Sequence, residues 1–183
     1  MRRRILTAVA LCAVMGAGLT LGACEKGKPR HVPVDPMALT PPPPGPVAPP
    51  TDGLSAGLPK LAGRPGLSLD RIGEAPDPLN RKPAVTPADA ALVFTGFGFD
   101  PTAKAPARGV DVVVDGKTYG ALYGQPRADV GVYFKDPGLT AVGYSLILPP
   151  RTLAKGPHSV MVRVIAADGK GYFQSPNYAF TVD

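Results

Sequence analysis

The chain has no tryptophan, and cysteine and histidine are nearly as scarce, with two residues of each. Both cysteines, Cys12 and Cys24, lie close to the N-terminus. The rest of the sequence therefore has no thiol for a disulfide, a thiolate nucleophile or a zinc–cysteine site. A domain built from it must be stabilised by its own apolar core.

Residues suited to catalysis are also few. His31 lies between proline and basic residues, and His158 follows a Gly-Pro turn at the start of a predicted strand. A catalytic histidine needs an oriented partner and a nucleophile within reach, but no Gly-x-Ser-x-Gly elbow is present. EF-hand spacing is missing too, and most aspartates stand beside Gly or Pro, where turn formation accounts for them. We therefore interpret His158 as structural and expect no enzyme, no metal and no cofactor.

Aromatic residues are missing before Phe94, although six Phe and six Tyr follow. Residues 25–87 instead contain 16 of the 24 prolines. Such a segment has too little large apolar surface to offset the entropy of ordering it, and its proline runs favour polyproline II. We predict a disordered, proline-rich tether over residues 24–87. Within it, Leu67–Ile72 is interpreted as featureless linker, with a brief helical turn or a docking peptide as alternatives.

Residues 88–183 show period-two alternation with frequent turn residues, the pattern of β-strands. Asp115-Gly116 is a strong hairpin signal between two of the strands. The stretch 129–134 is expected to be a short strand or a turn, and no convincing helix is present. The sequence therefore predicts an all-β domain, a single antiparallel sandwich. Its strands are expected over residues 91–99, 110–114, 117–123, 142–148, 158–166, 172–173 and 178–182.

Acidic residues are absent from residues 1–23, which contain Arg2, Arg3 and Arg4. Without that segment, 17 basic side chains face 14 acidic ones, and the net charge falls from +6 to +3. No dense Lys/Arg patch remains, so nucleic acid is not an expected partner.

The N-terminus has the three parts of a secretory signal: a basic start, an uncharged apolar stretch from Ile5, and small residues before a cleavage site. Its last four residues, Leu21-Gly22-Ala23-Cys24, resemble a bacterial lipobox. The resemblance implies a signal peptide over residues 1–23 and a mature lipoprotein that begins at Cys24 and is held in a membrane by acyl chains, palmitate included. The alternatives are an uncleaved membrane helix, which needs roughly 20 apolar residues, and ordinary secretion.

The residue that follows Cys24 indicates whether the lipoprotein resides in the inner or the outer membrane. An aspartate after the lipid-bearing cysteine is the inner-membrane retention signal of enterobacteria, and this chain has Glu25 instead. The resemblance therefore favours the outer membrane, facing the periplasm, if the source is Gram-negative.

A second resemblance concerns the fold. The run Leu153 to Val160, followed by Val162, Val164 and Asp168-Gly169, resembles the later strands of bacterial Ig-like domains. The segments Tyr123 to Val130 and Gly143-Tyr144-Ser145 are similar to one recurring subset of those modules. The resemblance implies an Ig-like sandwich, a fold that serves many roles.

Arg127 and Asp129 are the most suggestive polar pair, because residues i and i+2 of an extended segment point to the same side. They are expected to brace a loop, or alternatively to form a fork that contacts a carboxylate or phosphate. Tyr123 and Tyr133 join them as candidate binding residues on a sheet face or its loops. Core filling is the favoured interpretation of the tyrosines, with a glycan or peptide platform as the alternative.

These features predict a membrane-tethered, non-enzymatic lipoprotein of the cell envelope that presents an Ig-like binding or structural module. Its expected partners are membrane lipid, through acylated Cys24, and an envelope protein or glycan. A carbohydrate-binding module is the alternative, and an envelope enzyme of unknown type comes third.

Cys24→Ala should abolish lipid attachment, because the Cys24 thiol is the acylation site after cleavage. Incorporation of radiolabelled palmitate measures this directly, with Cys12→Ala as the matched control that keeps its label. Label on the Cys24→Ala protein would contradict the lipoprotein interpretation.

Overall fold

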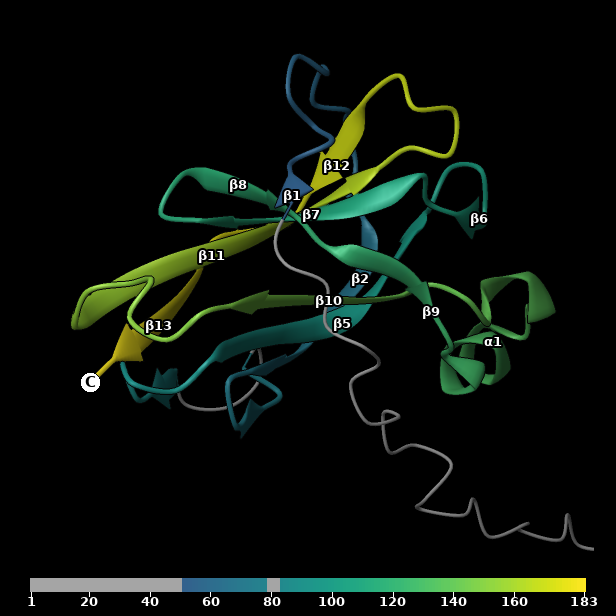
Figure 1. Ribbon diagram of the computed structural model, residues 1–183. Helices are drawn as coiled ribbons and strands as arrows, with labels where there is room; N and C mark the ends of the chain where they lie inside the picture. Colours follow the sequence, from purple (N-terminus) through teal and green to yellow (C-terminus); the bar gives the residue numbers. More distant parts are fainter. Residues whose placement is uncertain (1–50, 79–82) are drawn as a thin grey trace, which may run out of the picture. The chain divides into compact units, whose positions relative to one another are not determined.

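A computed structural model describes residues 51–78 and 83–183 (Figure 1). The predicted signal peptide, Cys24 and the first half of the predicted tether lie outside the described residues. Within residues 51–78 and 83–183, no helix has both the length and the apolar character needed to cross a membrane.

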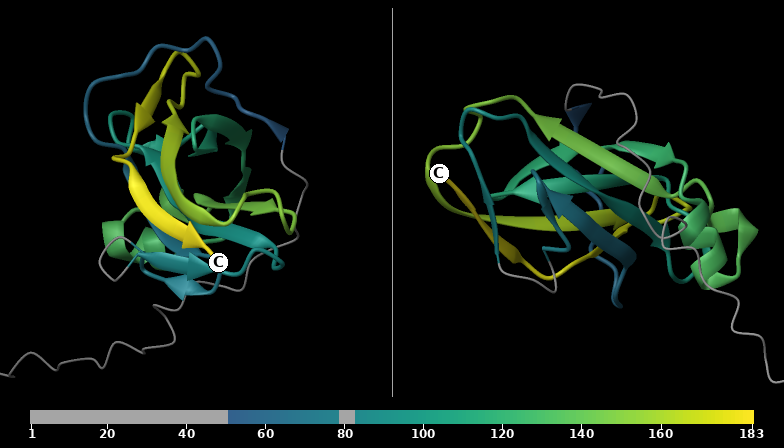
Figure 2. Two further views of the ribbon diagram at one scale, coloured as in Figure 1. Left: turned by 90° about the vertical axis from the view of Figure 1, so that its left-hand side faces the viewer. Right: turned by 90° about the horizontal axis from the view of Figure 1, so that it is seen from below.

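The described chain forms two β-sheets that face each other, which confirms the predicted all-β sandwich (Figures 1 and 2). The first sheet has the path β1-β8-β7-β11-β13-β4, with β12 paired to β11. Its strands are β1 (Thr51–Asp52), β4 (Ala84–Thr86), β7 (Gly109–Val114), β8 (Lys117–Gly120), β11 (Gly156–Ile165), β12 (Tyr172–Gln174) and β13 (Tyr178–Val182).

The second sheet has the path β3-β2-β5-β10-β9, with β6 paired to β5. Its strands are β2 (Gly66–Ile72), β3 (Ala75–Pro76), β5 (Leu92–Asp100), β6 (Ala105–Pro106), β9 (Leu122–Gln125) and β10 (Gly143–Leu148). Two short helices, α1 (Ala128–Phe134) and the 3₁₀ helix η2 (Pro137–Leu139), connect β9 to β10.

The strand order is that of an immunoglobulin sandwich, in which strands A, B, E and D face strands C, F and G. In spatial order along the sheets, β2, β5, β10 and β9 take the first set of positions, and β7, β11 and β13 take the second. The ladders between named strands are antiparallel except for the parallel pairing of β4 with β13.

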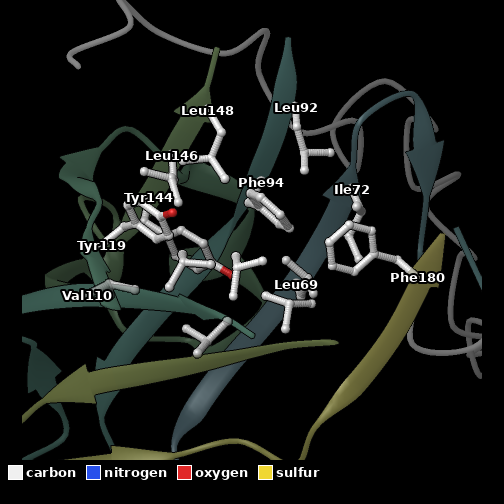
Figure 3. Close-up of a cluster of buried hydrophobic side chains, with 14 of the residues drawn as sticks. Leu69, Ile72, Leu92, Phe94, Val110, Tyr119, Tyr144, Leu146, Leu148 and Phe180 are labelled. Atoms are coloured by element: carbon white, nitrogen blue, oxygen red, sulfur yellow. The ribbon is translucent and has the colours of Figure 1, made fainter. Parts of the chain in front are cut away.

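The core lies between the two sheets and is filled by alternating side chains of both (Figure 3). Phe94 of β5 meets Phe180 of β13 edge to face, with ring centroids 5.8 Å apart. Leu69 and Ile72 of β2 are fully buried in the same core. Burial of these apolar side chains is the main favourable contribution to folding, at roughly 25 cal/mol per Å².

The predicted domain boundary at residue 88 is wrong, because β1, β2, β3 and β4 all precede it. Leu67–Ile72, interpreted as linker, belongs to β2 and pairs with β5 over most of its length. A further stretch is fixed by Asp111, a fully buried carboxylate of β7 that accepts hydrogen bonds from the backbone N–H groups of Leu54 and Ser55 at 2.9 and 2.7 Å. Proline content and missing aromatics concealed this segment, since few of its residues are apolar, although Leu69, Ile72 and Ala84 are buried in the core.

The expectation of a strand or turn over residues 129–134 is also wrong, since α1 occupies it. Gly131 lies close to Thr140 and to the carbonyl of Asp136, so only a residue without a side chain fits this approach. Lys135 ends the helix in the left-handed conformation, with φ at 54°. By contrast, the hairpin signal at Asp115-Gly116 is confirmed, with φ of 49° and 83° at the two residues.

Leu69→Ala should lower the free energy of unfolding by about 2–5 kcal/mol, the range for truncating a buried leucine. Leu54→Ala is the control, because Leu54 is 53% exposed and its truncation should change stability by less than about 0.5 kcal/mol. Denaturant titration of the full chain measures both. Equal stability of the two variants would contradict the placement of β2 in the core.

Candidate functional site

A second apolar cluster lies on the outer face of the β2–β5 sheet. A Cβ atom at Gly98 would approach Val110 and Val164 of the core at 3.0 Å, so the alternating residues Phe97 and Phe99 face outward. Helix α1 and the segment after it cover this face, and their buried side chains pack on Phe99. The covering residues are Val130, Leu139 and Val142.

Aromatic rings continue this cluster toward solvent. Phe134 of α1 meets Phe99 at 5.0 Å and Phe97 at 6.1 Å, edge to face in both cases. Tyr133 in turn meets Phe134 at 4.9 Å and 78°. Edge-to-face pairs of this kind are worth about 0.5–1.5 kcal/mol beyond the area that they bury, so the outermost rings are held by those beneath them.

A pocket of about 380 Å³ opens between α1 and the neighbouring strands, within the size range of ligand sites. Its lining is mainly apolar and consists of Leu67, Ser68, Phe97, Asp129, Val130, Tyr133 and Phe134. Beside it, α1 exposes three large apolar side chains in a row. Val132 is 78% exposed, Tyr133 76% and Phe134 42%.

An ion-pair network anchors the start of α1. The Arg127 side chain is only 8% exposed and donates from Nε and Nη2 to the two carboxylate oxygens of Asp129, at 2.8 and 2.7 Å. Its Nη1 donates to Oδ2 of Asp70 at 2.7 Å. The guanidinium also lies 5.2 Å from the ring centre of Phe97, within cation–π range.

A β-bulge brings Asp70 into this network. Leu69 pairs with Gly96 and Arg71 with Thr95, so Asp70 is the additional residue of β2. A bulge of this kind bends the strand and redirects a side chain. Here, the redirected carboxylate reaches Arg127, which lies 57 positions later in the chain.

The network keeps its charges. Burial disfavours the guanidinium, but hydrogen bonds and attraction from Asp129 and Asp70 outweigh this and raise the pKa of Arg127. The hydrogen bonds from Arg127 are the largest influence on Asp129, and they lower the pKa of its carboxyl against the opposing effect of burial. With one cation and two carboxylates, the three side chains have a net charge of −1.

The four predicted site residues, Arg127, Asp129, Tyr123 and Tyr133, do not all lie at one site. Arg127 and Asp129 bond to each other, although Asp129 lies in α1 and not in the expected extended segment, and Tyr133 lies at the pocket with Asp129. Tyr123 has another position: its hydroxyl donates to the carbonyl of Gly98 at 2.7 Å and accepts from the N–H of Ala107 at 2.9 Å. Burial raises the pKa of Tyr123 to about 12, only partly opposed by the Ala107 N–H.

Sequence reasoning missed six residues of this site, namely Leu67, Ser68, Asp70, Phe97, Val130 and Phe134. No local pattern marks the bulge that redirects Asp70. A signal did exist for Phe134, because Val132-Tyr133-Phe134 is a run of large apolar residues with no polar alternation.

Three further aspartates, each beside Gly or Pro in the sequence, stabilise turns as predicted. Asp136 and Asp168 each accept a hydrogen bond from the backbone N–H two residues later. Asp100 accepts from three backbone N–H groups, which lower its carboxyl pKa although burial acts in the opposite direction. Across residues 51–78 and 83–183, no group of three or more His, Cys, Asp or Glu side chains is placed to hold a metal ion.

His158 forms a separate ion pair at the start of β11. Its Nδ1 lies 2.6 Å from Oδ2 of Asp115, and its Nε2 lies 2.7 Å from the carbonyl of Ala154. Both ring nitrogens face acceptors, which suits the doubly protonated ring. Burial lowers the pKa of His158, but Asp115 and the Ala154 carbonyl together raise it above its ordinary value. Burial raises the pKa of Asp115, and its bonds to His158 and Ser159 more than reverse this.

Neither the known protein-family models nor the curated protein sequences include a match to this chain.

Arg127→Ala should lower the free energy of unfolding by about 3 kcal/mol, since removing one partner of a buried ion pair strands the others. Asp129→Ala should lower it by about 1–3 kcal/mol, and the double variant by less than the sum. Chemical denaturation of the four proteins measures this coupling. Strictly additive losses, or none, would contradict the bracing role.

His158→Gln should reduce stability more at about pH 5.5 than at about pH 8.5. The pKa of His158 is raised on folding, so its contribution is complete below the unfolded value of about 6.5 and is lost as the pH rises through the folded value. Denaturant unfolding of both proteins at the two pH values measures the difference. Asp115→Asn is the control in which the pH dependence should largely vanish, and a loss that is the same at both pH values would contradict the assignment.

Proposed function

We propose that this chain is a membrane-tethered, non-enzymatic lipoprotein of the cell envelope whose β-sandwich binds a partner protein through the exposed face of α1. The observation that supports it is the run Val132-Tyr133-Phe134, exposed beside an apolar pocket. Large apolar side chains gathered in this way typically mark an interaction surface.

The contacts that hold α1 in place support a binding role for this helix. A seven-residue helix is not stable by itself in water, so tertiary contacts must hold it. They are supplied by Phe99 underneath and by the Arg127 network, which ties the first turn to Asp70 of β2. A surface fixed before binding loses less conformational entropy on association.

The orientation of the rings favours a protein partner over a glycan. Tyr133 and Phe134 meet at 78°, so they do not form the coplanar platform on which a sugar ring stacks. Exposed aromatic side chains around a pocket are instead typical of the energetically dominant residues of protein interfaces.

In this proposal, acylated Cys24 holds the protein in the membrane, and residues 24–50 separate it from the sandwich. The partner is then a protein of the same membrane or of the space beside it.

Photo-crosslinking in cells tests the proposal, with p-benzoylphenylalanine in place of Tyr133. We expect a protein adduct at this position and none with the same group in place of Leu54, which is 53% exposed and lies beside Gly109 of the other sheet. Cys24→Ala should reduce the adduct, because the protein leaves the membrane. Equal adducts at both positions, or adducts only to glycan, would contradict a partner protein at α1.

A further inference from the structure

Strand β2 has an edge that the other described strands cover only in part. It pairs with β5 on one side, and on the other β3 pairs with Arg71 and Ile72 alone. Among residues 51–78 and 83–183, no strand pairs with Leu67–Leu69 on that side. Uncovered edges present backbone donors and acceptors to any extended chain.

The contacts of Ser68 show in which direction the backbone N–H and C=O groups of Leu67–Leu69 point. Its carbonyl accepts the hydroxyl of Tyr144, which reaches it from β10 at 3.0 Å. A Cβ atom at Gly96 would lie 2.0 Å from this carbonyl and 2.7 Å from the Tyr144 hydroxyl, so the bare glycine permits this approach. The Ser68 groups therefore face β5, and by alternation those of Leu67 and Leu69 face the uncovered edge.

The uncovered edge and the pocket are continuous. Leu67 and Ser68 line the pocket on one side, and Tyr133 and Phe134 of α1 line it on the other. A strand added along Leu67–Leu69 would place every second side chain on the outer face, where the pocket opens. Peptide recognition by strand addition combines these two features: main-chain pairing gives affinity and a side-chain pocket gives specificity.

Charge narrows the choice of peptide. The edge ends at the bulge, where the Asp70 and Asp129 side chains remain 17% and 15% exposed. One guanidinium balances only one of these carboxylates. A basic side chain near the bulge would complement the remaining charge, whereas an acidic one would be repelled.

We propose that the β2 edge and the pocket together bind an extended segment of the partner protein. The backbone of this segment pairs with Leu67–Leu69, and one aromatic or large aliphatic side chain enters the pocket beside Tyr133 and Phe134. A lysine or arginine of the segment lies near Asp70 and Asp129. The inference rests on the proposed function and specifies its partner. A proline-rich stretch of this chain would suit the edge less well, because proline has no backbone N–H to donate.

The missing tryptophan simplifies the experiment, since the chain itself adds no tryptophan emission to that of a probe peptide. The probe is the amidated, N-acetylated peptide Thr-Lys-Val-Trp-Val-Thr-Lys, added to the full chain in lipid nanodiscs. We expect a saturable shift of its emission to shorter wavelength, with a dissociation constant below about 1 mM. Empty nanodiscs show how much of the shift is due to lipid.

Two altered peptides separate backbone pairing from charge. N-methyl groups on alternate amides remove the main-chain donors and should weaken binding at least about tenfold. Replacing both lysines by glutamates should weaken it too, and more strongly at low salt than at high salt.

Variants of the chain locate the site. Tyr133→Ala should weaken binding about tenfold or more, as expected for an aromatic residue central to an interface. Leu54→Ala should leave it within about twofold. Both side chains are more than half exposed, so both variants should keep the melting temperature of the unaltered protein.

Several results would overturn the inference. They are no saturation of the probe, equal binding to empty nanodiscs, full binding of the N-methylated peptide, or an unchanged constant for Tyr133→Ala. Displacement of the probe by a peptide of residues 38–50, or by raising the protein concentration, would assign the edge to this chain itself. A protein crosslink at Tyr133 with a probe that does not bind would preserve the proposed function and reject strand addition.

Discussion

The candidate site depends on the contact of the Arg127 guanidinium with the carboxylates of Asp129 and Asp70. It joins three pieces that local sequence would not hold together: the first turn of α1, the loop before it, and the bulge of β2. A guanidinium this deeply buried requires its carboxylate partners, because an unpaired charge there would be strongly destabilising. The same contact that fixes the helix therefore also fixes the strand edge beside it.

The aromatic cluster on the outer face is the second requirement. A β-sandwich needs one core between its sheets, and this chain adds a smaller one outside them, over Phe97 and Phe99. The segment between β9 and β10 supplies the cover, and the last residues of α1 remain exposed. The core between the sheets thus provides most of the buried apolar surface, while the segment between β9 and β10 carries the candidate binding residues.

The edge of β2 and the bulge act together. Natural sheets protect their edges with bulges, charges and short strands, and here Asp70 supplies both a bulge and a charge. Its protection ends where Leu67–Leu69 begin, beside the pocket. A strand edge that is uncovered along its whole length can pair with any extended chain. Here the uncovered part lies at the mouth of an apolar pocket, so only a peptide with suitable side chains combines main-chain pairing with burial in the pocket.

The sequence by itself determined the strand alternation and the Asp115-Gly116 hairpin, because each depends on residues close together in the chain. Only tertiary structure decided that Leu69 and Ile72 are core residues, since the burial that orders β2 comes from β5 and β13, far along the sequence. The same holds for α1, whose short apolar run has no helical signal and is held by Phe99 and the ion-pair network. Asp70 shows the limit most clearly: a bulge arises from the register between two strands, and register is a property of the pair.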